Sequence, residues 1–79
     1  MKIVLTGKMT QTRDQMWEKF NKQSIKVMKA VTSTTDYLVT GNMMGVTSKY
    51  EDAKAKGTII LTEQEFYVMI EKDYPEYML

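Results

Sequence analysis

The chain has 79 residues, a formal net charge of +1 and neither cysteine nor histidine, which limits it to one small domain without disulfides or thiolate metal sites. The lack of histidine also removes the commonest general base and the commonest metal ligand. The apolar runs are far too short to span a bilayer and the N-terminus has no cleavable signal pattern, so we expect a soluble cytoplasmic protein.

The charge is unevenly distributed along the chain. Residues 1–40 carry seven Lys and Arg against three Asp and Glu, whereas residues 41–79 carry four against seven. A basic first half favours nucleic acid or another acidic partner only where the charges converge in space. Otherwise, uneven charge is ordinary for the surface of a small domain.

The first half of the chain predicts a strand, a helix and a weaker strand. Residues 2–6 are typical of a buried strand because their apolar side chains are consecutive. Thr12 and Gln15 form a capping box that opens a helix, and the helix carries an apolar stripe made of Met16, Trp17 and Phe20. We expect Trp17 to anchor this helix in the core rather than to stack on bases. The weaker strand is expected within residues 25–31.

The second half repeats this pattern with two further strands, at residues 37–40 and 58–61. Ser48 and Thr62 each precede a glutamate by three residues, which is typical of a capping box at a helix start. Gly57 is a natural residue to follow the end of the helix that Ser48 opens. A last apolar stripe predicts the final helix: Phe66, Met69 and Ile70.

The resulting element order is β-α-β-β-α-β-α, which predicts an α/β fold with a mainly parallel sheet and helices on both faces. Because Pro75 disfavours a helical residue before it, we expect a single domain over residues 1–72 and a short tail over 73–79. Ligand sites in such folds lie beyond the carboxyl ends of strands. Thr6-Gly7 and Thr40-Gly41 occupy such ends, and each then leads to a helix N-terminus, which favours an anion. The same pattern is also how parallel strands are ordinarily connected.

Enzymatic chemistry finds no support in the residue pattern. The segment from Gly41 to Lys49 departs from a P-loop because Gly45 is followed by Val46-Thr47, whereas a P-loop has Lys-Ser or Lys-Thr there. A serine or threonine nucleophile would lack a histidine base, and we expect no metal site and no cofactor. Met43-Met44 lies in an expected loop, where the pair is either an adaptable partner contact or a plug that folds back onto the core.

The matching segments, taken together, resemble a BRCT domain over residues 2 to about 70. They resemble most the domain that ends bacterial NAD-dependent DNA ligases and that of the replication factor C large subunit. The resemblance implies a four-stranded parallel sheet in the order 2-1-3-4, with the first and third helices on one face. Gln23-Ser24 replaces the usual Gly-Gly, and Phe66-Tyr67 stands where many members have tryptophan. The segments are Val4-Leu5-Thr6-Gly7, Thr12-Arg13-Asp14, Lys26-Val27, Val31-Thr32, Thr35-Asp36-Tyr37-Leu38-Val39, Gly41, Gly45, Ser48-Lys49, Ala53, Ala55, Gly57-Thr58-Ile59-Ile60 and Glu63-Gln64-Glu65-Phe66.

The resemblance implies a phosphate site formed by Thr6, Gly7 and Lys49, with Arg13 added in members that bind DNA ends. A hydroxyl, a backbone N–H and cations around one concavity form a charge-assisted phosphate site on physical grounds too. Arg13 and Lys49 are both expected in the first turn of a helix, where a cation is unfavourable beside the positive end of the helix dipole. An anion bound between the two cations would offset this cost. Each residue also has a structural reading: Thr6 caps its loop, Gly7 permits a tight turn, and Lys49 is solvated. Lys8 is expected to contact the neighbouring DNA backbone.

The expected function is a non-enzymatic BRCT module that binds DNA ends bearing a 5′-phosphate, in DNA replication, repair or ligation. The alternative is a protein interaction module that recognises a phosphopeptide, or docks through Met43 and Met44, and that recruits or belongs to a DNA ligase or similar enzyme. The chain lacks an adenylated-lysine motif and is too short to ligate alone. We expect no membrane partner, a monomer by default, and a location at the nucleoid in a bacterium or phage or in the nucleus of a eukaryote.

Overall fold

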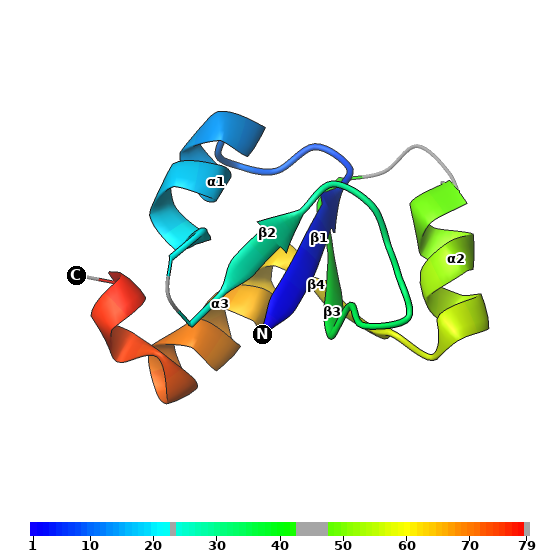
Figure 1. The fold of residues 1–79 in the computed structure, drawn as a ribbon. Helices are drawn as coiled ribbons and strands as arrows, with labels where there is room; N and C mark the ends of the chain where they lie inside the picture. The colour runs from blue at the N-terminus through cyan, green and yellow to red at the C-terminus, as the bar shows by residue number, and fades with distance from the viewer. Residues whose placement is uncertain (23, 43–47, 79) are drawn as a thin grey trace.

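The computed structural model describes residues 1–22, 24–42 and 48–78. Figure 1 shows a central sheet with helices on both sides, and the expected element order is confirmed. The elements are β1 (Lys2–Thr6), α1 (Arg13–Phe20), β2 (Lys26–Met28), β3 (Tyr37–Thr40), α2 (Ser48–Lys56), β4 (Ile59–Thr62), α3 (Glu63–Asp73) and the 3₁₀ helix η1 (Pro75–Met78). None of the described helices is long and apolar enough to cross a membrane.

All four strands are parallel and lie in the order β2-β1-β3-β4, as the resemblance implied. α1 and α3 cover one face, and α2 covers the other (Figure 1). Along β1, Ile3 and Leu5 pack under α1 and α3, whereas Val4 packs under α2. Both faces of the strand are therefore covered, which explains why its apolar residues are consecutive.

β2 is shorter than the apolar pattern of residues 25–31 indicated. Ile25 and Val27 are buried on the α1 and α3 face, but the strand ends at Met28. Val31 has already left the sheet and packs beneath α2, beside Val4 and Ala53. The apolar residues after Met28 thus serve the opposite core cluster rather than a longer strand.

The expectation that Trp17 anchors α1 in the core is wrong. Met16 and Phe20 are the buried residues of this helix, whereas Trp17 is 40% exposed. Residues four apart share a helix face, so Met16 and Phe20 define the core face, and Trp17 points about 100° away from Met16. Phe20 is the anchor, since its ring meets the ring of Phe66 edge-on at 5.1 Å between centroids.

Two of the three expected capping boxes are present, at Thr12 in front of α1 and at Thr62 in front of α3. α2 begins at Ser48 itself, so this hydroxyl belongs to the helix, and the residue before it lies outside the described ranges. The end of α2 is as expected: Gly57 has φ +73°. Its N–H and that of Thr58 return to the carbonyls of the last helical turn, which completes a Schellman motif.

The residues expected as a tail pack against the domain. α3 runs to Asp73, and η1 then places the Tyr77 ring parallel to the Phe20 ring, with 6.3 Å between centroids. The Tyr77 hydroxyl accepts a hydrogen bond from the Ser24 N–H at 3.2 Å. The segment therefore extends the core that α1 and α3 cover.

Candidate phosphate-binding site

The carboxyl ends of β1 and β3 are joined side by side. The Gly41 N–H donates to the Thr6 carbonyl at 2.8 Å, and Lys8 and Asn42 exchange two main-chain hydrogen bonds of 2.9 and 2.8 Å. A Cβ atom on Gly41 would lie 2.4 Å from the Lys8 carbonyl oxygen, so this approach requires glycine. The two Thr-Gly ends therefore form one rim, and Gly7, at φ +81°, turns the chain away from it.

The loop from Gly7 to α1 is held in place by α3. Glu63 accepts hydrogen bonds from the Thr10 N–H and hydroxyl and from the Tyr67 hydroxyl. Burial raises the pKa of Glu63, but these hydrogen bonds outweigh it and lower the pKa below its ordinary value. Burial and the bond to Glu63 raise the pKa of Tyr67 to about 12. This clamp determines where the loop delivers Arg13.

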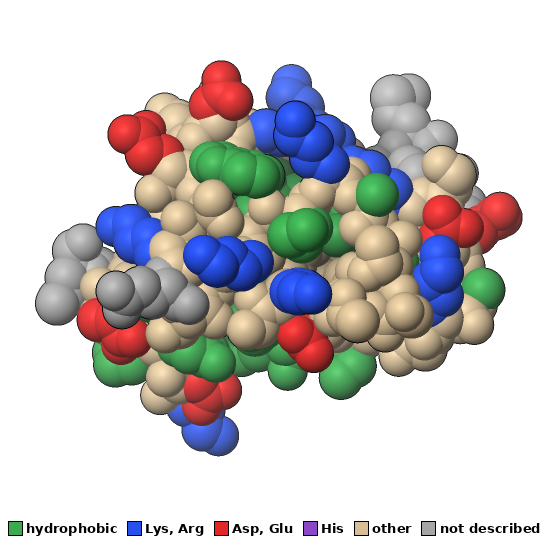
Figure 2. All heavy atoms as spheres, viewed as in Figure 1, with side chains coloured by type: hydrophobic (Ala, Val, Ile, Leu, Met, Phe, Trp, Pro, Cys, Tyr) green, Lys and Arg blue, Asp and Glu red, His purple; other side chains and the backbone are tan. Residues whose placement is uncertain are grey.

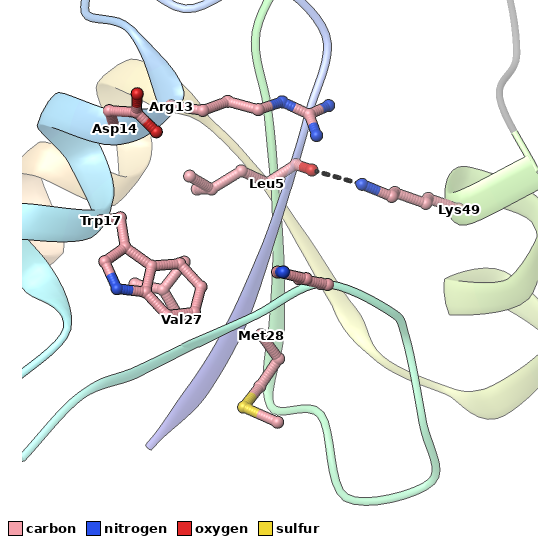
Figure 3. A pocket seen from close by; sticks show the side chains of 8 residues that line it. Leu5, Arg13, Asp14, Trp17, Val27, Met28 and Lys49 are labelled. Carbon is pink, nitrogen blue, oxygen red and sulfur yellow. Dashed lines mark hydrogen bonds between the residues drawn. The ribbon is translucent and has the colours of Figure 1, made fainter.

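Arg13 and Lys49 line the same depression, which has a volume of about 470 Å³. They come from opposite faces of the sheet, in the first turns of α1 and α2. Figure 3 shows the two side chains pointing toward one another over the end of β1. Lys49 Nζ donates a hydrogen bond to the Leu5 carbonyl at 3.2 Å, which fixes the ammonium group on this side of the rim.

The electrostatics of this pair favour an anion. Burial, and then the positive charge of Arg13, lower the pKa of Lys49, and no carboxylate among the described residues contributes to the shift. Asp14 also lines the depression, but its carboxylate lies on the side away from Lys49 (Figure 3). Two cations held together without a counter-charge are relieved by a ligand with negative charge.

The other expected site residues lie around this depression rather than in it. Gly7 and Lys8 line a neighbouring hollow formed by the loop before α1, and Arg13 borders both hollows. Thr6 is 3% exposed within the sheet and is not among the described residues that line the depression. Met43 and Met44 lie outside the described residues.

Trp17, Met28 and Lys29 also line the depression, although the sequence did not predict them as site residues. A signal for Trp17 was present, because it follows Arg13 by four residues and so shares its helix face. Met28 and Lys29 gave no such signal, since their position depends on where β2 ends. Figure 2 shows Lys and Arg side chains gathered between α1 and the start of α2, beside exposed hydrophobic side chains.

Comparison with known proteins agrees with this architecture. Residues 1–70 match the family model of the BRCA1 C Terminus (BRCT) domain. The chain is 45% identical over 69 residues to a DNA ligase of Shewanella baltica, covering 86% of the chain. It is 38% identical over 65 residues to a DNA ligase of Ruthia magnifica, covering 82% of the chain. A DNA ligase of Mycoplasma capricolum is 34% identical over 71 residues, or 90% of the chain.

The matched region is only a small part of these relatives, since the chain spans about a tenth of their length. No solved structure matches the chain significantly. The family match covers nearly the whole chain, and the sheet order and the arrangement of helices follow the pattern that the resemblance implied. The chain therefore belongs to the BRCT domain family.

Proposed function

We propose that this domain binds DNA ends through their 5′-phosphate, without catalysing a reaction, in DNA replication, repair or ligation. The observation that supports the proposal is the shared depression of Arg13 and Lys49, in which burial, and then the charge of Arg13, lower the pKa of Lys49. A terminal phosphate monoester carries more charge than a bridging phosphodiester, so an uncompensated pair of cations favours a chain end over the interior of a duplex.

Each residue has a distinct part in this proposal. The Arg13 guanidinium offers a planar pair of donors that matches two phosphate oxygens, and the Lys49 ammonium supplies a compact charge opposite it. Gly7 and Lys8, in the neighbouring hollow that Arg13 borders, contact the next part of the DNA backbone. Thr6, buried in the sheet, supports the turn at Gly7 rather than touching the ligand.

The similar proteins indicate which class of enzyme this domain would serve. They are DNA ligases, so we propose that the domain serves a DNA-joining enzyme, either within one longer chain or as its partner. Such a role places it in the cytoplasm at the nucleoid of a bacterium. Holding a phosphorylated end is useful to this class of enzyme, because the 5′-phosphate marks an end that can be joined.

A phosphorylated protein is the alternative ligand, because a phosphoserine presents the same dianion to Arg13 and Lys49. The cation pair does not by itself distinguish the two sources of phosphate. The alternative of docking through Met43 and Met44 concerns residues outside the described ranges. A partner that remains bound to a Lys49→Glu variant would indicate docking away from the depression.

The test compares two duplexes of one sequence, with and without a 5′-phosphate, in a chemical-shift titration of the isotope-labelled domain. We expect tighter binding of the phosphorylated end, shifts at Gly7, Arg13 and Lys49, and affinity that falls steeply with salt. Arg13→Glu and Lys49→Glu should abolish the preference. Lys54→Glu is the matched control, because Lys54 is an exposed cation of the same helix α2 that lies over the Tyr50 ring. Equal affinity for both ends would remove the proposal.

A further inference from the structure

The depression between α1 and α2 is aromatic and apolar as well as cationic. Leu5 and Val27 supply buried apolar surface, while Trp17 and Met28 are each 40% exposed along its lining. Figure 3 shows the Trp17 ring on the α1 side of the depression, with Val27 behind it, while the Arg13 side chain extends from the same helix toward Lys49. A large aromatic side chain left half open beside cations is suited to a ligand that is both flat and charged.

The spacing of Arg13 and Trp17 along α1 suits a ligand with one charged part and one flat part. Arg13 and Trp17 are four residues apart in one helix, so they share a face of α1, with their Cα atoms about 6 Å apart along the axis. In a nucleotide, a single sugar separates the phosphate from the base, so a charged group and a flat group are also held close together. Because Trp17 lines the same depression as Arg13 and Lys49, a phosphate between the two cations would leave its own base beside the part of the lining that Trp17 forms.

The charge of the lining favours a nucleic acid over a singly phosphorylated peptide. Among the described residues, three cations line the depression, Arg13, Lys29 and Lys49, against the single carboxylate of Asp14. Lys29 follows the end of β2 and is exposed, so it remains available once Arg13 and Lys49 hold one phosphate. A second phosphate is present one nucleotide further along any DNA strand, but not in a peptide with one phosphoserine.

We propose that the depression holds the 5′-terminal nucleotide of the DNA end, with its base stacked on Trp17 and its phosphate between Arg13 and Lys49. This inference rests on the proposed function and adds a subsite for the base. A base must leave its duplex stack to enter a pocket. The domain should therefore prefer an end whose terminal nucleotide is unpaired, with little dependence on base identity, because every base has a stacking face.

Trp17 makes the test direct, because it is the single tryptophan of the chain. The probes are duplexes with a one-nucleotide 5′ overhang that carries a 5′-phosphate and either a base or an abasic sugar. The end that carries the base should quench tryptophan fluorescence and bind about 5- to 100-fold more tightly than the abasic end. The same pair without the 5′-phosphate measures the phosphate requirement separately.

Substitution of Trp17 distinguishes stacking from a structural role. With labelled DNA and anisotropy as the readout, Trp17→Phe should retain most of the discrimination between base and abasic ends. Trp17→Leu should bind both ends equally while still preferring 5′-phosphate over 5′-hydroxyl. Circular dichroism and thermal melts verify that both variants fold.

The outcomes separate this inference from the proposed function. Equal affinity of the wild type for base and abasic ends, with the phosphate preference intact, overturns base stacking alone. Discrimination that persists in Trp17→Leu overturns the role of Trp17. A phosphoserine peptide with a neighbouring aromatic residue that quenches Trp17 more strongly than the DNA end identifies a peptide as the occupant, so the nucleotide assignment would be wrong. If neither the base end nor the abasic end binds more tightly with a 5′-phosphate than without one, the proposed function is contradicted. The nucleotide assignment, which rests on it, is then contradicted as well.

Discussion

Lys49 Nζ donates a hydrogen bond to the main-chain oxygen of Leu5 at 3.2 Å, so the first turn of α2 is tied to the end of β1. This contact holds the ammonium group where the charge of Arg13 reaches it. The pair joins helices on opposite faces of the sheet, and it is the structural basis of the proposed phosphate site.

The phosphate affinity should depend on pH through Lys49. Burial and Arg13 lower the pKa of Lys49 below its ordinary value of 10.5, so its charge, and with it the affinity for a 5′-phosphate, is lost at a lower pH than for a solvated lysine. Anisotropy titrations between neutral pH and pH 10.5 measure this. In Lys49→Arg the charge persists, and the alkaline decline should disappear. An equal decline in both proteins would show that another group titrates.

Lys49→Ala should separate binding from stability. A lowered pKa means that folding disfavours the charged ammonium, and this cost is fully present below the lowered pKa and vanishes as pH rises from there through the ordinary value of 10.5. Removing the charge should leave the melting temperature unchanged or higher at neutral pH, while affinity for the phosphorylated end falls roughly 10- to 100-fold. Paired thermal melts and DNA titrations test this. A large drop in melting temperature would assign Lys49 a structural role.

Glu63→Gln should loosen the loop that carries Arg13 and reduce acid sensitivity. The pKa of Glu63 is lowered in the folded state, so its ionised form stabilises the fold above the ordinary value of 4.5, and this contribution is lost as pH falls through the lowered pKa. Urea unfolding at neutral and acidic pH should show a smaller difference in the variant than in the wild type. Glu71→Gln, on the exposed face of α3, should behave as the wild type.

Gly41→Ala should be destabilising because the new Cβ atom meets the Lys8 carbonyl oxygen at 2.4 Å. We expect a loss of about 1–3 kcal/mol in the free energy of unfolding, together with weaker DNA binding, since the rim of the site must shift. Gly57→Asn is the control: φ is +73° there, but no atom lies within 4 Å of a Cβ. It should cost less than about 1 kcal/mol. Denaturant unfolding of both variants compares the two losses.

Leu38→Ala and Trp17→Ala should differ in their effect on stability. Leu38 is fully buried beneath α2, so its truncation leaves a cavity and should cost about 2–5 kcal/mol. Trp17 is 40% exposed, and its loss should cost less than half as much. Unfolding followed by circular dichroism compares the two. Equal losses would mean that Trp17 supports the core despite its exposure.

Much of the fold could be predicted because its determinants are local. Consecutive apolar residues in β1, the capping boxes at Thr12 and Thr62, and Gly57 after α2 act within a few residues of one another. The Thr-Gly ends of β1 and β3 likewise identified the rim, because the carboxyl ends of parallel strands meet at one edge. The sheet order needed the family resemblance in addition.

What the sequence by itself determined was therefore the strands and α-helices, their order and the two cations that open helices, but neither the end of β2 nor η1. Only the tertiary structure decided which side chains meet. It turned Trp17 outward because Met16 and Phe20 already fill the core face of α1, and it brought Trp17, Arg13 and Lys49 to one depression. Burial and proximity depend on how all the elements pack, so a periodic pattern within one helix does not specify them.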